Sequence, residues 1–201
     1  MTTILLASRN AKKLGELRRI LGPAVPELEV IGLDDLASIG LAPYEEVPES
    51  GASFADNALL KARAGFKHTG LPTVADDSGL TVDALNGMPG VLSARWCGRH
   101  GDDRANNDLL LAQLADVPDE RLTAAFRASV AYVDGERELV VDGEMPGSLI
   151  REPRGEHGFG YDPLFVPAGR RQTSAELDPA EKDAISHRGQ ALRLLADLLA
   201  R

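Results

Sequence analysis

The sequence has one cysteine, few aromatic residues and no long apolar run. Cys97 stands alone among 201 residues, so no internal disulfide can form, and no Cys/His spacing resembles a zinc site. No stretch approaches the roughly 20 consecutive apolar residues of a membrane helix. Met1 leads into a strand-like segment without a basic leader or cleavage site. These absences predict a cytoplasmic protein with no membrane partner.

Positive charge is also scarce. The chain carries 22 Lys and Arg against 31 Asp and Glu, a formal net charge of -9 at pH 7. A protein that coats nucleic acid needs a surplus of basic residues facing the phosphates, so we expect no nucleic-acid partner. An anionic small molecule would have to be bound locally, by a few clustered bases and by carboxylates that hold a divalent metal.

The composition that is present is typical of an ordinary globular protein. Hydrophobic residues make up 43% of the chain and charged residues 26%, which is enough apolar side chain to build a core. No internal repeat and no long linker divides the sequence. We therefore expect one domain over residues 1–201 with two lobes, and an α/β fold with a mixed sheet.

Hydrophobic periodicity places the expected elements. Strands are expected at 3–7, 28–31, 71–75, 80–82, 124–133, 138–141 and 164–166, and helices at 11–21, 53–69, 102–114 and 186–200. Gly22-Pro23 is expected to end the first helix, and Ser53 to cap the second. The pair Asp76-Asp77 is expected directly after the third strand.

The first candidate site is the turn Ser8-Arg9-Asn10-Ala11-Lys12-Lys13, where a strand leads into a helix. The free N–H groups and the dipole at a helix N-terminus attract anions, so phosphate is the natural ligand. Ser8 and Asn10 add neutral hydrogen bonds, and Lys12 or Lys13 adds charge. The alternative is a common Asn-capped turn followed by solvated lysines.

The second candidate site is acidic. Asp76 and Asp77 would lie at the carboxyl end of a strand, the usual mouth of an α/β active site. Glu49, in the polar loop before Ser53, could join them to form the oxygen-rich environment that Mg²⁺ prefers, with Glu45 and Glu46 as competitors for that role. Solvated turn aspartates are the alternative.

The third candidate is the run Gly158-Phe159-Gly160-Tyr161-Asp162, where glycines permit close backbone approach and an aromatic ring could stack on a base. The alternative is a loop with buried rings. A fourth candidate joins Lys182 to Ser186-His187-Arg188 ahead of the last helix. Taken separately, these residues are also typical of a solvated helix N-terminus.

Six segments in order closely resemble the inosine/xanthosine triphosphate pyrophosphatase family. They are Ser8-x-Asn10-x-x-Lys13, Glu49-Ser50-Gly51-x-Ser53-Phe54-x-x-Asn57-Ala58, Ala75-Asp76-Asp77-Ser78-Gly79-Leu80, Pro89-Gly90-Val91-x-Ser93-Ala94-Arg95, Phe159-Gly160-Tyr161-Asp162-Pro163 and Ser186-His187-Arg188. Each segment alone is weakly specific, but six with suitable spacing span almost the whole chain.

The resemblance implies an elongated two-lobed α/β structure, with a central mixed β-sheet flanked by helices and an active site in the cleft between the lobes. It also implies a homodimer, with Pro89 to Arg95 near the interface, and a Mg²⁺ cofactor. Asp77 would be the catalytic base and a metal ligand, beside Glu49 and Asp76. The substrate contacts implied are Ser8, Arg9, Asn10, Ala11, Lys12, Lys13, Ser78, Phe159, Gly160, Tyr161, Asp162, Lys182, His187 and Arg188.

The implied activity is hydrolysis of the purine nucleoside triphosphates ITP, dITP and XTP to the monophosphate and pyrophosphate, which keeps these nucleotides out of DNA and RNA. Selectivity would need donors facing the six-oxygen of the base, for which His187, Arg188 and backbone N–H groups around Gly160 are candidates. Two other readings stay open: a pyrophosphatase for modified pyrimidine triphosphates, and a nucleotide-sensing module that binds without turnover.

Overall fold

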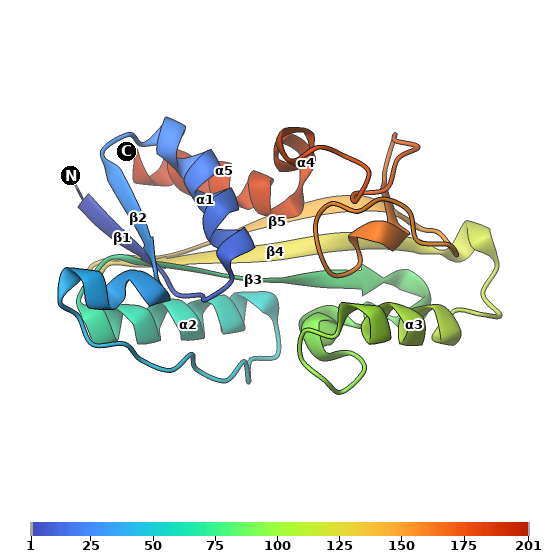
Figure 1. Cartoon of the computed structure of the whole chain (residues 1–201), viewed down its shortest axis with the longest axis horizontal. Helices are drawn as coiled ribbons and strands as arrows, with labels where there is room; N and C mark the ends of the chain where they lie inside the picture. The colour runs from blue at the N-terminus through green and yellow to red at the C-terminus, as the bar shows by residue number, and fades with distance from the viewer. Residues whose placement is uncertain (1, 201) are drawn as a thin grey trace. The chain divides into compact units, whose positions relative to one another are not determined.

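A computed structural model describes residues 2–200, which form one six-stranded sheet in the order β2-β1-β3-β4-β5-β6, flanked by helices (Figure 1). The strands are β1 Thr2–Leu6, β2 Leu28–Gly32, β3 Thr73–Val82, β4 Thr123–Val133, β5 Glu138–Leu149 and β6 Phe165–Pro167. The main helices are α1 Ala11–Ala24, α2 Phe54–Thr69, α3 Asp103–Gln113, α4 Pro179–Ile185 and α5 His187–Leu199. Strand β1 is parallel to β2 and β3, whereas β5 and β6 are antiparallel, so the predicted mixed α/β sheet is confirmed.

The chain divides into two compact units. The first comprises the described residues up to Asp77 together with Ala128–Gly143 and the chain from Arg188 on, and the second comprises Ser78–Arg127 and Glu144–His187. Strands β3, β4 and β5 pass from one unit into the other. The single domain over 1–201 and the cleft stay predictions, and residues 1 and 201 lie outside the described part. None of the described helices is both long and apolar enough to cross a membrane.

In the first unit, helices cover both faces of the strands. Helices α1 and α5 pack on one face, where Leu17 and Leu192 meet Val74 of β3, and α2 packs on the other, where Ala58 meets Ala75 (Figure 1). Successive strand side chains point to opposite faces, so a strand covered on both sides needs an unbroken apolar run. This explains why β1 reads Ile-Leu-Leu without alternation.

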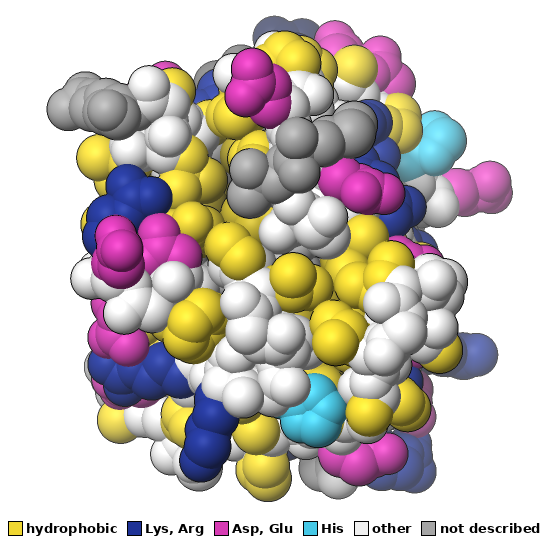
Figure 2. All heavy atoms as spheres, turned by 90° about the vertical axis from the view of Figure 1, so that its left-hand side faces the viewer, with side chains coloured by type: hydrophobic (Ala, Val, Ile, Leu, Met, Phe, Trp, Pro, Cys, Tyr) yellow, Lys and Arg dark blue, Asp and Glu magenta, His cyan; other side chains and the backbone are white. Residues whose placement is uncertain are grey.

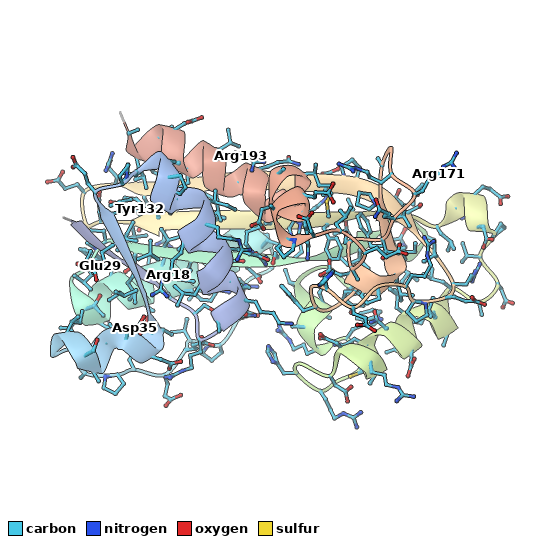
Figure 3. The ribbon with its side chains drawn as sticks, turned by 45° about the horizontal axis from the view of Figure 1, so that its top comes forward. Arg18, Glu29, Asp35, Tyr132, Arg171 and Arg193 are labelled. Carbon is cyan, nitrogen blue, oxygen red and sulfur yellow. The ribbon has the colours of Figure 1, made fainter. Side chains whose placement is uncertain are left out.

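Polar side chains at the surface also fix α1 against β2. Arg18 Nε donates to the Val30 carbonyl oxygen at 3.0 Å, and its guanidinium pairs with Asp35 at 3.3 Å (Figure 3). Asn10 caps the start of α1, since its side-chain oxygen accepts hydrogen bonds from the N–H groups of Lys12 and Lys13. The orientation of α1 is therefore set at its first turn and along its length.

The prediction that Gly22-Pro23 ends the first helix was wrong, because α1 continues to Ala24 with Pro23 inside it. Proline removes one backbone donor and its ring clashes with the carbonyl four residues earlier. Here Pro23 is the penultimate helical residue, so only one hydrogen bond is affected, and the Val25 N–H still bonds to the Leu21 oxygen at 2.8 Å. A proline in the last turn did not stop the helix.

The third strand also differs from expectation. It does not end at Ala75: β3 runs without a break from Thr73 to Val82, and Asp76 and Asp77 lie inside it. The pairing with β1 ends at Leu6 opposite Val74, so the acidic pair follows the point where the neighbouring parallel strand stops. Two adjacent charged residues inside a strand break the apolar pattern that predicts one. The strand accommodates them because Lys13, Arg188 and Lys61 from neighbouring helices pair with the carboxylates.

Two further elements were under-predicted. Strand β5 extends past Val141 to Leu149, through a segment in which Met145 and Leu149 are buried and the other residues are exposed or half-buried. Helix α4 was not expected at all, since its seven residues are too few to show helical periodicity. Its sequence signal is local: Asp178 caps it and Pro179 occupies its first position.

A glycine brings α2 close to β3. A Cβ added at Gly65 would lie 2.7 Å from Cγ2 of Thr73, a fully buried β-branched residue that cannot move aside easily. In α1, by contrast, a Cβ at Gly15 would lie 3.4 Å from Arg19 Nη1, the flexible end of a long side chain. The close approach at Gly65 sets the distance between α2 and the acidic part of β3.

We expect Gly65→Ala to destabilise the protein by about 1–3 kcal/mol, because overpacking at Thr73 outweighs the gain in helix propensity. The matched control Gly15→Ala should instead stabilise it by about 0.5–1 kcal/mol, because alanine has the higher helix propensity. Urea unfolding of both variants measures this difference. A Gly65→Ala protein at least as stable as the wild type would contradict the close approach.

Candidate active site

Two adjacent carboxylates in β3 point to opposite faces of the sheet. Asp76 shares the face of Val74 and Asp77 shares the face of Ala75, as strand alternation requires. Asp76 therefore meets α1 and α5, while Asp77 meets α2. One dipeptide thus organises charged groups on both sides of the sheet.

Asp76 is 4% exposed and is held by two cations. Its Oδ2 lies 2.9 Å from Lys13 Nζ and 3.0 Å from Arg188 Nε, and Arg188 also pairs with Glu16 of α1. Burial alone would raise the pKa of Asp76, but the nearby cations Lys13, Arg188 and Lys61 outweigh it and hold that pKa well below its usual range. Asp76 is therefore an anion throughout the ordinary pH range.

The basic turn and the acidic pair lie together, as the sequence predicted. Asn10 Oδ1 accepts from the N–H groups of Lys12 and Lys13 at 3.0 and 3.2 Å, and the Asn10 N–H bonds to Ser8 Oγ at 3.2 Å. This capped turn directs Lys13 to Asp76. Burial lowers the pKa of Lys13, although Asp76 opposes the shift.

On the other face, Asp77 is buried between α2 and the loop that carries Glu49. Asn57 Nδ2 donates to Asp77 Oδ2 at 2.8 Å, and Lys61 Nζ lies 2.6 Å from Glu49 Oε1 and 4.0 Å from Asp77 Oδ1. Burial raises the pKa of Asp77 and the Glu49 charge adds to this, while Lys61 and the Asn57 hydrogen bond act against it. A carboxylate with a raised pKa is a better proton acceptor than an ordinary aspartate.

Asn57 also holds the Glu49 loop. Its side-chain oxygen accepts from the Gly51 N–H at 2.7 Å, while its nitrogen donates to Asp77. A Cβ at Gly51 would lie 2.7 Å from that same oxygen, so glycine is needed for the loop to approach. One asparagine therefore links the loop, the helix and the strand.

Sequence reasoning missed Lys61 and Glu16 as members of the site. Lys61 lies on the buried stripe of α2, one turn after Asn57 and between Ala58 and Ala62. A lysine within an apolar helical stripe is a recognisable signal, because lysine is rarely buried without a partner. Glu16 gives no comparable signal, since only the fold brings it to Arg188.

Arg9 points elsewhere. Its guanidinium donates to Asp34 Oδ1 and to the Tyr44 carbonyl oxygen, both at 2.9 Å, and its backbone N–H donates to Glu46 Oε1 at 2.6 Å. Arg9 thus anchors the preceding part of the Glu49 loop. Glu46 is engaged there, which favours Glu49 over its neighbours as the acidic partner of Asp77.

The other predicted substrate contacts in the turn and in β3 are exposed or half-buried. Ala11 and Lys12 are exposed at the start of α1, and Ser8 is half-buried. Ser78 follows Asp77 in β3 and is half-buried as well. Their roles as substrate contacts stay predictions.

The acidic residues suit a hard divalent cation, although they are not arranged as a preformed cage. Within residues 2–200, no group of three or more His, Cys, Asp or Glu side chains converges as metal ligands. Among the described atoms, however, Asp76 Oδ1 is buried without a hydrogen-bond partner, and Glu49 and Asp77 already share one cation, Lys61. Carboxylate oxygens are the donors that Mg²⁺ takes, so the residues fit this metal.

The second unit gathers the predicted aromatic loop around Asp162. Asp162 Oδ2 accepts from the Phe159 N–H at 2.8 Å and pairs with Lys182 Nζ at 2.5 Å. The same lysine nitrogen lies 5.4 Å from the centroid of the Phe159 ring. Three of the predicted residues therefore form one cluster, and the half-buried Phe159 ring lies at its edge.

Gly160 is held at both of its backbone polar groups. Its N–H donates to Asp103 Oδ2 at 2.7 Å, and its carbonyl oxygen accepts from Asn107 Nδ2 at 3.0 Å. Both partners are residues of α3, and Asp103 is its first residue. The Gly160 N–H is therefore engaged within the protein, and the idea that it faces a purine oxygen is not supported by this geometry.

Two other predicted residues have buried side chains. Tyr161 is 3% exposed and donates from its hydroxyl to the Ser93 carbonyl oxygen at 2.9 Å, so its ring belongs to the core. His187 stacks on Phe126 with ring centroids 5.1 Å apart and an interplanar angle of 12°. Phe159 is thus the aromatic residue of the loop with an accessible face.

The mixed sheet and the compensated acidic pair define an α/β protein built around a buried ionic site. The model of the Ham1 family matches residues 4–198, and the chain belongs to this family. It is 63% identical over 202 residues to a protein of Nocardia farcinica named dITP/XTP pyrophosphatase, covering 100% of this chain and 96% of that one. A Mycobacterium tuberculosis protein of the same name is 60% identical over 200 residues, covering 99% and 96%.

Solved structures agree. A HAM1 protein from Coxiella burnetii is similar with a TM-score of 0.88 at 41% identity, covering 100% of this chain and 99% of that chain. The dITP/XTP pyrophosphatase of Mycobacterium abscessus aligns with a TM-score of 0.78 at 62% identity, covering 96% and 98%. The predicted family and fold class are therefore confirmed.

We expect Asp76→Asn to destabilise the protein by about 3–5 kcal/mol at pH 7, because Lys13 and Arg188 would lose their shared buried anion. The folded pKa of Asp76 lies below the ordinary 3.8, so its contribution is fully present above about pH 4 and is lost as the pH falls toward the folded pKa. Urea unfolding at pH 7 and pH 3 should show a larger difference from wild type at pH 7.

Asp34→Asn is the control. Asp34 pairs with Arg9 at the surface, where the two side chains are 71% and 41% exposed, so the substitution should change stability by at most about 1 kcal/mol. Equal effects of the two substitutions would show that the Asp76 pairs contribute no more than a surface ion pair.

Proposed function

We propose that this protein is a Mg²⁺-dependent nucleoside triphosphate pyrophosphatase that converts ITP, dITP and XTP to the monophosphate and pyrophosphate and so clears them from the nucleotide pool. The observation that carries the proposal is the buried carboxylate of Asp77, with a raised pKa, beside a cluster of acidic and basic side chains. Relatives that match the whole chain and are named dITP/XTP pyrophosphatase support the substrate class.

In the proposed reaction, Asp77 accepts a proton from the water that attacks the α-phosphorus, and the α-β phosphoanhydride bond breaks to release pyrophosphate as one unit. Asn57 holds Asp77 Oδ2, which fixes the orientation of the carboxylate. The raised pKa of Asp77 favours proton transfer from water. The choice of the α-phosphorus rests on the names of the relatives.

Lysines would offset the charge of the triphosphate. Lys13 lies at the capped start of α1, and Lys61 lies on the opposite face beside Glu49. Each is already paired with a carboxylate, so a polyphosphate would exchange one anionic partner for another. Developing charge on the leaving group is the charge that such cations stabilise in a transition state.

Glu49 and Asp77 would hold Mg²⁺, and Asp76 would join them past the end of β1, where the Lys61 charge already interacts with both aspartates. When bound, this ion neutralises phosphate charge and activates water as a nucleophile. The base would be recognised in the second unit, where Phe159 offers a stacking face and Lys182 a positive charge. A hydrogen-bond donor that faces the six-oxygen of hypoxanthine would face an amino group in adenine and would have no acceptor. The loss of binding free energy for adenine would be about 1–3 kcal/mol.

Homodimer formation and a cytoplasmic location belong to the same proposal. Figure 2 shows apolar side chains at the surface of one face of the molecule. The described exposed hydrophobic residues also include Met88, which precedes the segment Pro89 to Arg95 that the resemblance places near the interface. Exposed apolar area of this kind is typical of surfaces that bind a protein partner. Sedimentation as a monomer at micromolar concentration would contradict the dimer.

The direct test is pyrophosphate release with Mg²⁺ from ITP, dITP, XTP, ATP, GTP and dUTP. We expect the three deaminated purine nucleotides to have the largest kcat/KM values. A preference for dUTP would reject the purine assignment, and tight binding without turnover of any of the six would favour the nucleotide-sensing module.

We expect Asp77→Asn to lower kcat by a factor of about 10²–10⁴, the range attributed to a general base. The affinity for an uncleavable α,β-methylene analogue of ITP should stay measurable. The pKa of Asp77 is raised in the folded protein, so ionisation of Asp77 lowers the free energy of unfolding at pH values above that pKa. Asparagine carries no charge, and we therefore expect the variant to be at least as stable as wild type at pH 7.

The control for this experiment is Asp108→Asn, an exposed aspartate of α3 whose side chain is 72% exposed. It should hydrolyse ITP at the wild-type rate. Wild-type turnover by Asp77→Asn would remove this carboxylate from the mechanism.

A further inference from the structure

Lys61 is the central feature of the Asp77 face. Its Nζ lies 2.6 Å from Glu49 Oε1 and 4.0 Å from Asp77 Oδ1, so one ammonium group lies between two carboxylates. This is the position that a small cation binding both carboxylates would also take. A protein cation and a metal cation cannot share it, because their charges repel strongly at such short distances.

The position of Lys61 is built into the fold. The residue is buried on α2 one turn after Asn57, which bonds to Asp77 and to the loop that carries Glu49. The close approach at Gly65, one turn further along, fixes the helix against β3. The ammonium therefore reaches the carboxylates from a rigid element, as a positioned group must.

The acidic residue on the opposite face is compensated in the same way. Lys13 Nζ and Arg188 Nε both lie on Asp76 Oδ2, while Asp76 Oδ1 is a buried oxygen without a hydrogen-bond partner in the part of the chain that the structure describes. Neither Lys13 nor Arg188 occupies Asp76 Oδ1, because both lie on Oδ2. At Glu49 and Asp77, by contrast, Lys61 occupies the position between the two carboxylates.

We propose that Lys61 acts as an internal counter-cation: by pairing with Glu49 and Asp77 it weakens the binding of free metal to these carboxylates. The metal then binds tightly only together with a polyphosphate, because the phosphates attract Lys61 away from the carboxylates. The inference rests on the proposed function, because it takes Glu49 and Asp77 as metal ligands. The phosphate chain supplies the anion that Lys61 needs once it leaves the carboxylates. The protein then takes up the metal–triphosphate complex as a unit.

Thermodynamic linkage makes this dependence reciprocal. If a nucleotide raises the affinity for metal by some factor, the metal raises the affinity for the nucleotide by the same factor, and such factors are typically about 5- to 150-fold. Lys61 is the proposed origin of the coupling. Removing the Lys61 charge should have two effects: free metal should bind more tightly, and the nucleotide should raise the affinity for metal by a smaller factor.

The experiment measures Mn²⁺ binding to the full chain by electron paramagnetic resonance of free Mn²⁺, without nucleotide and then with the α,β-methylene analogue of ITP. We expect Lys61→Met to bind Mn²⁺ alone about tenfold or more tightly than wild type, and to show a smaller gain on addition of the analogue. Wild type should bind Mn²⁺ weakly until the analogue is present.

Lys67→Met is the matched control, since it removes one positive charge from an exposed position on the same helix. It should bind Mn²⁺ like wild type, which separates the local effect of Lys61 from net charge. Lys61→Gln, which keeps a polar group, serves as a second variant if Lys61→Met unfolds, and thermal unfolding checks both.

The proposal is overturned if folded Lys61→Met and Lys61→Gln bind free Mn²⁺ no more tightly than wild type and Lys67→Met. It is also overturned if wild type binds free Mn²⁺ as tightly as it does with the analogue. Pyrophosphate release from ITP by wild type, measured in parallel, tests the proposed function separately, because hydrolysis can proceed whether or not Lys61 controls metal binding.

Discussion

The structure of the first unit depends on the compensation of two adjacent carboxylates inside a covered strand. An uncompensated charge in such a place is very costly, so partners must reach Asp76 and Asp77 from the helices on both faces. Lys13 and Arg188 reach one face from α1 and α5, and Lys61 reaches the other from α2. Packing these helices on the sheet and assembling the ionic site are therefore the same event.

The two carboxylates differ because their partners differ. Asp76 has two cations on one oxygen, and its pKa falls below the usual range. Asp77 accepts a hydrogen bond from Asn57 and lies 4.0 Å from the Lys61 ammonium, and burial has the largest effect on its pKa, which rises. Neighbours in sequence thus become a permanent anion and a proton acceptor, a division that environment alone can produce.

The loop around Gly160 in the second unit is held by hydrogen bonds to its backbone and by one buried ion pair. Two residues of α3 form hydrogen bonds to the N–H and the carbonyl oxygen of Gly160. Asp162 accepts a hydrogen bond from the Phe159 N–H and forms an ion pair with Lys182. These contacts fix the shape of an irregular loop that lies outside regular structure. A loop fixed in this way can present a ring with little loss of conformational entropy on binding.

The sequence by itself determined the elements with strong local patterns: the apolar strand β1, helix α2 from its Ser53 cap to Thr69, and the Asn10-capped turn. It also supplied both halves of the ionic site as candidates. Only the tertiary structure decided that β3 continues through its acidic pair, that Lys61 and Arg188 compensate it, and that the Gly160 N–H is engaged. The reason is physical, because the contacts at Asp76 and Asp77 join residues 112 and 20 positions apart, and local periodicity carries no information over such separations.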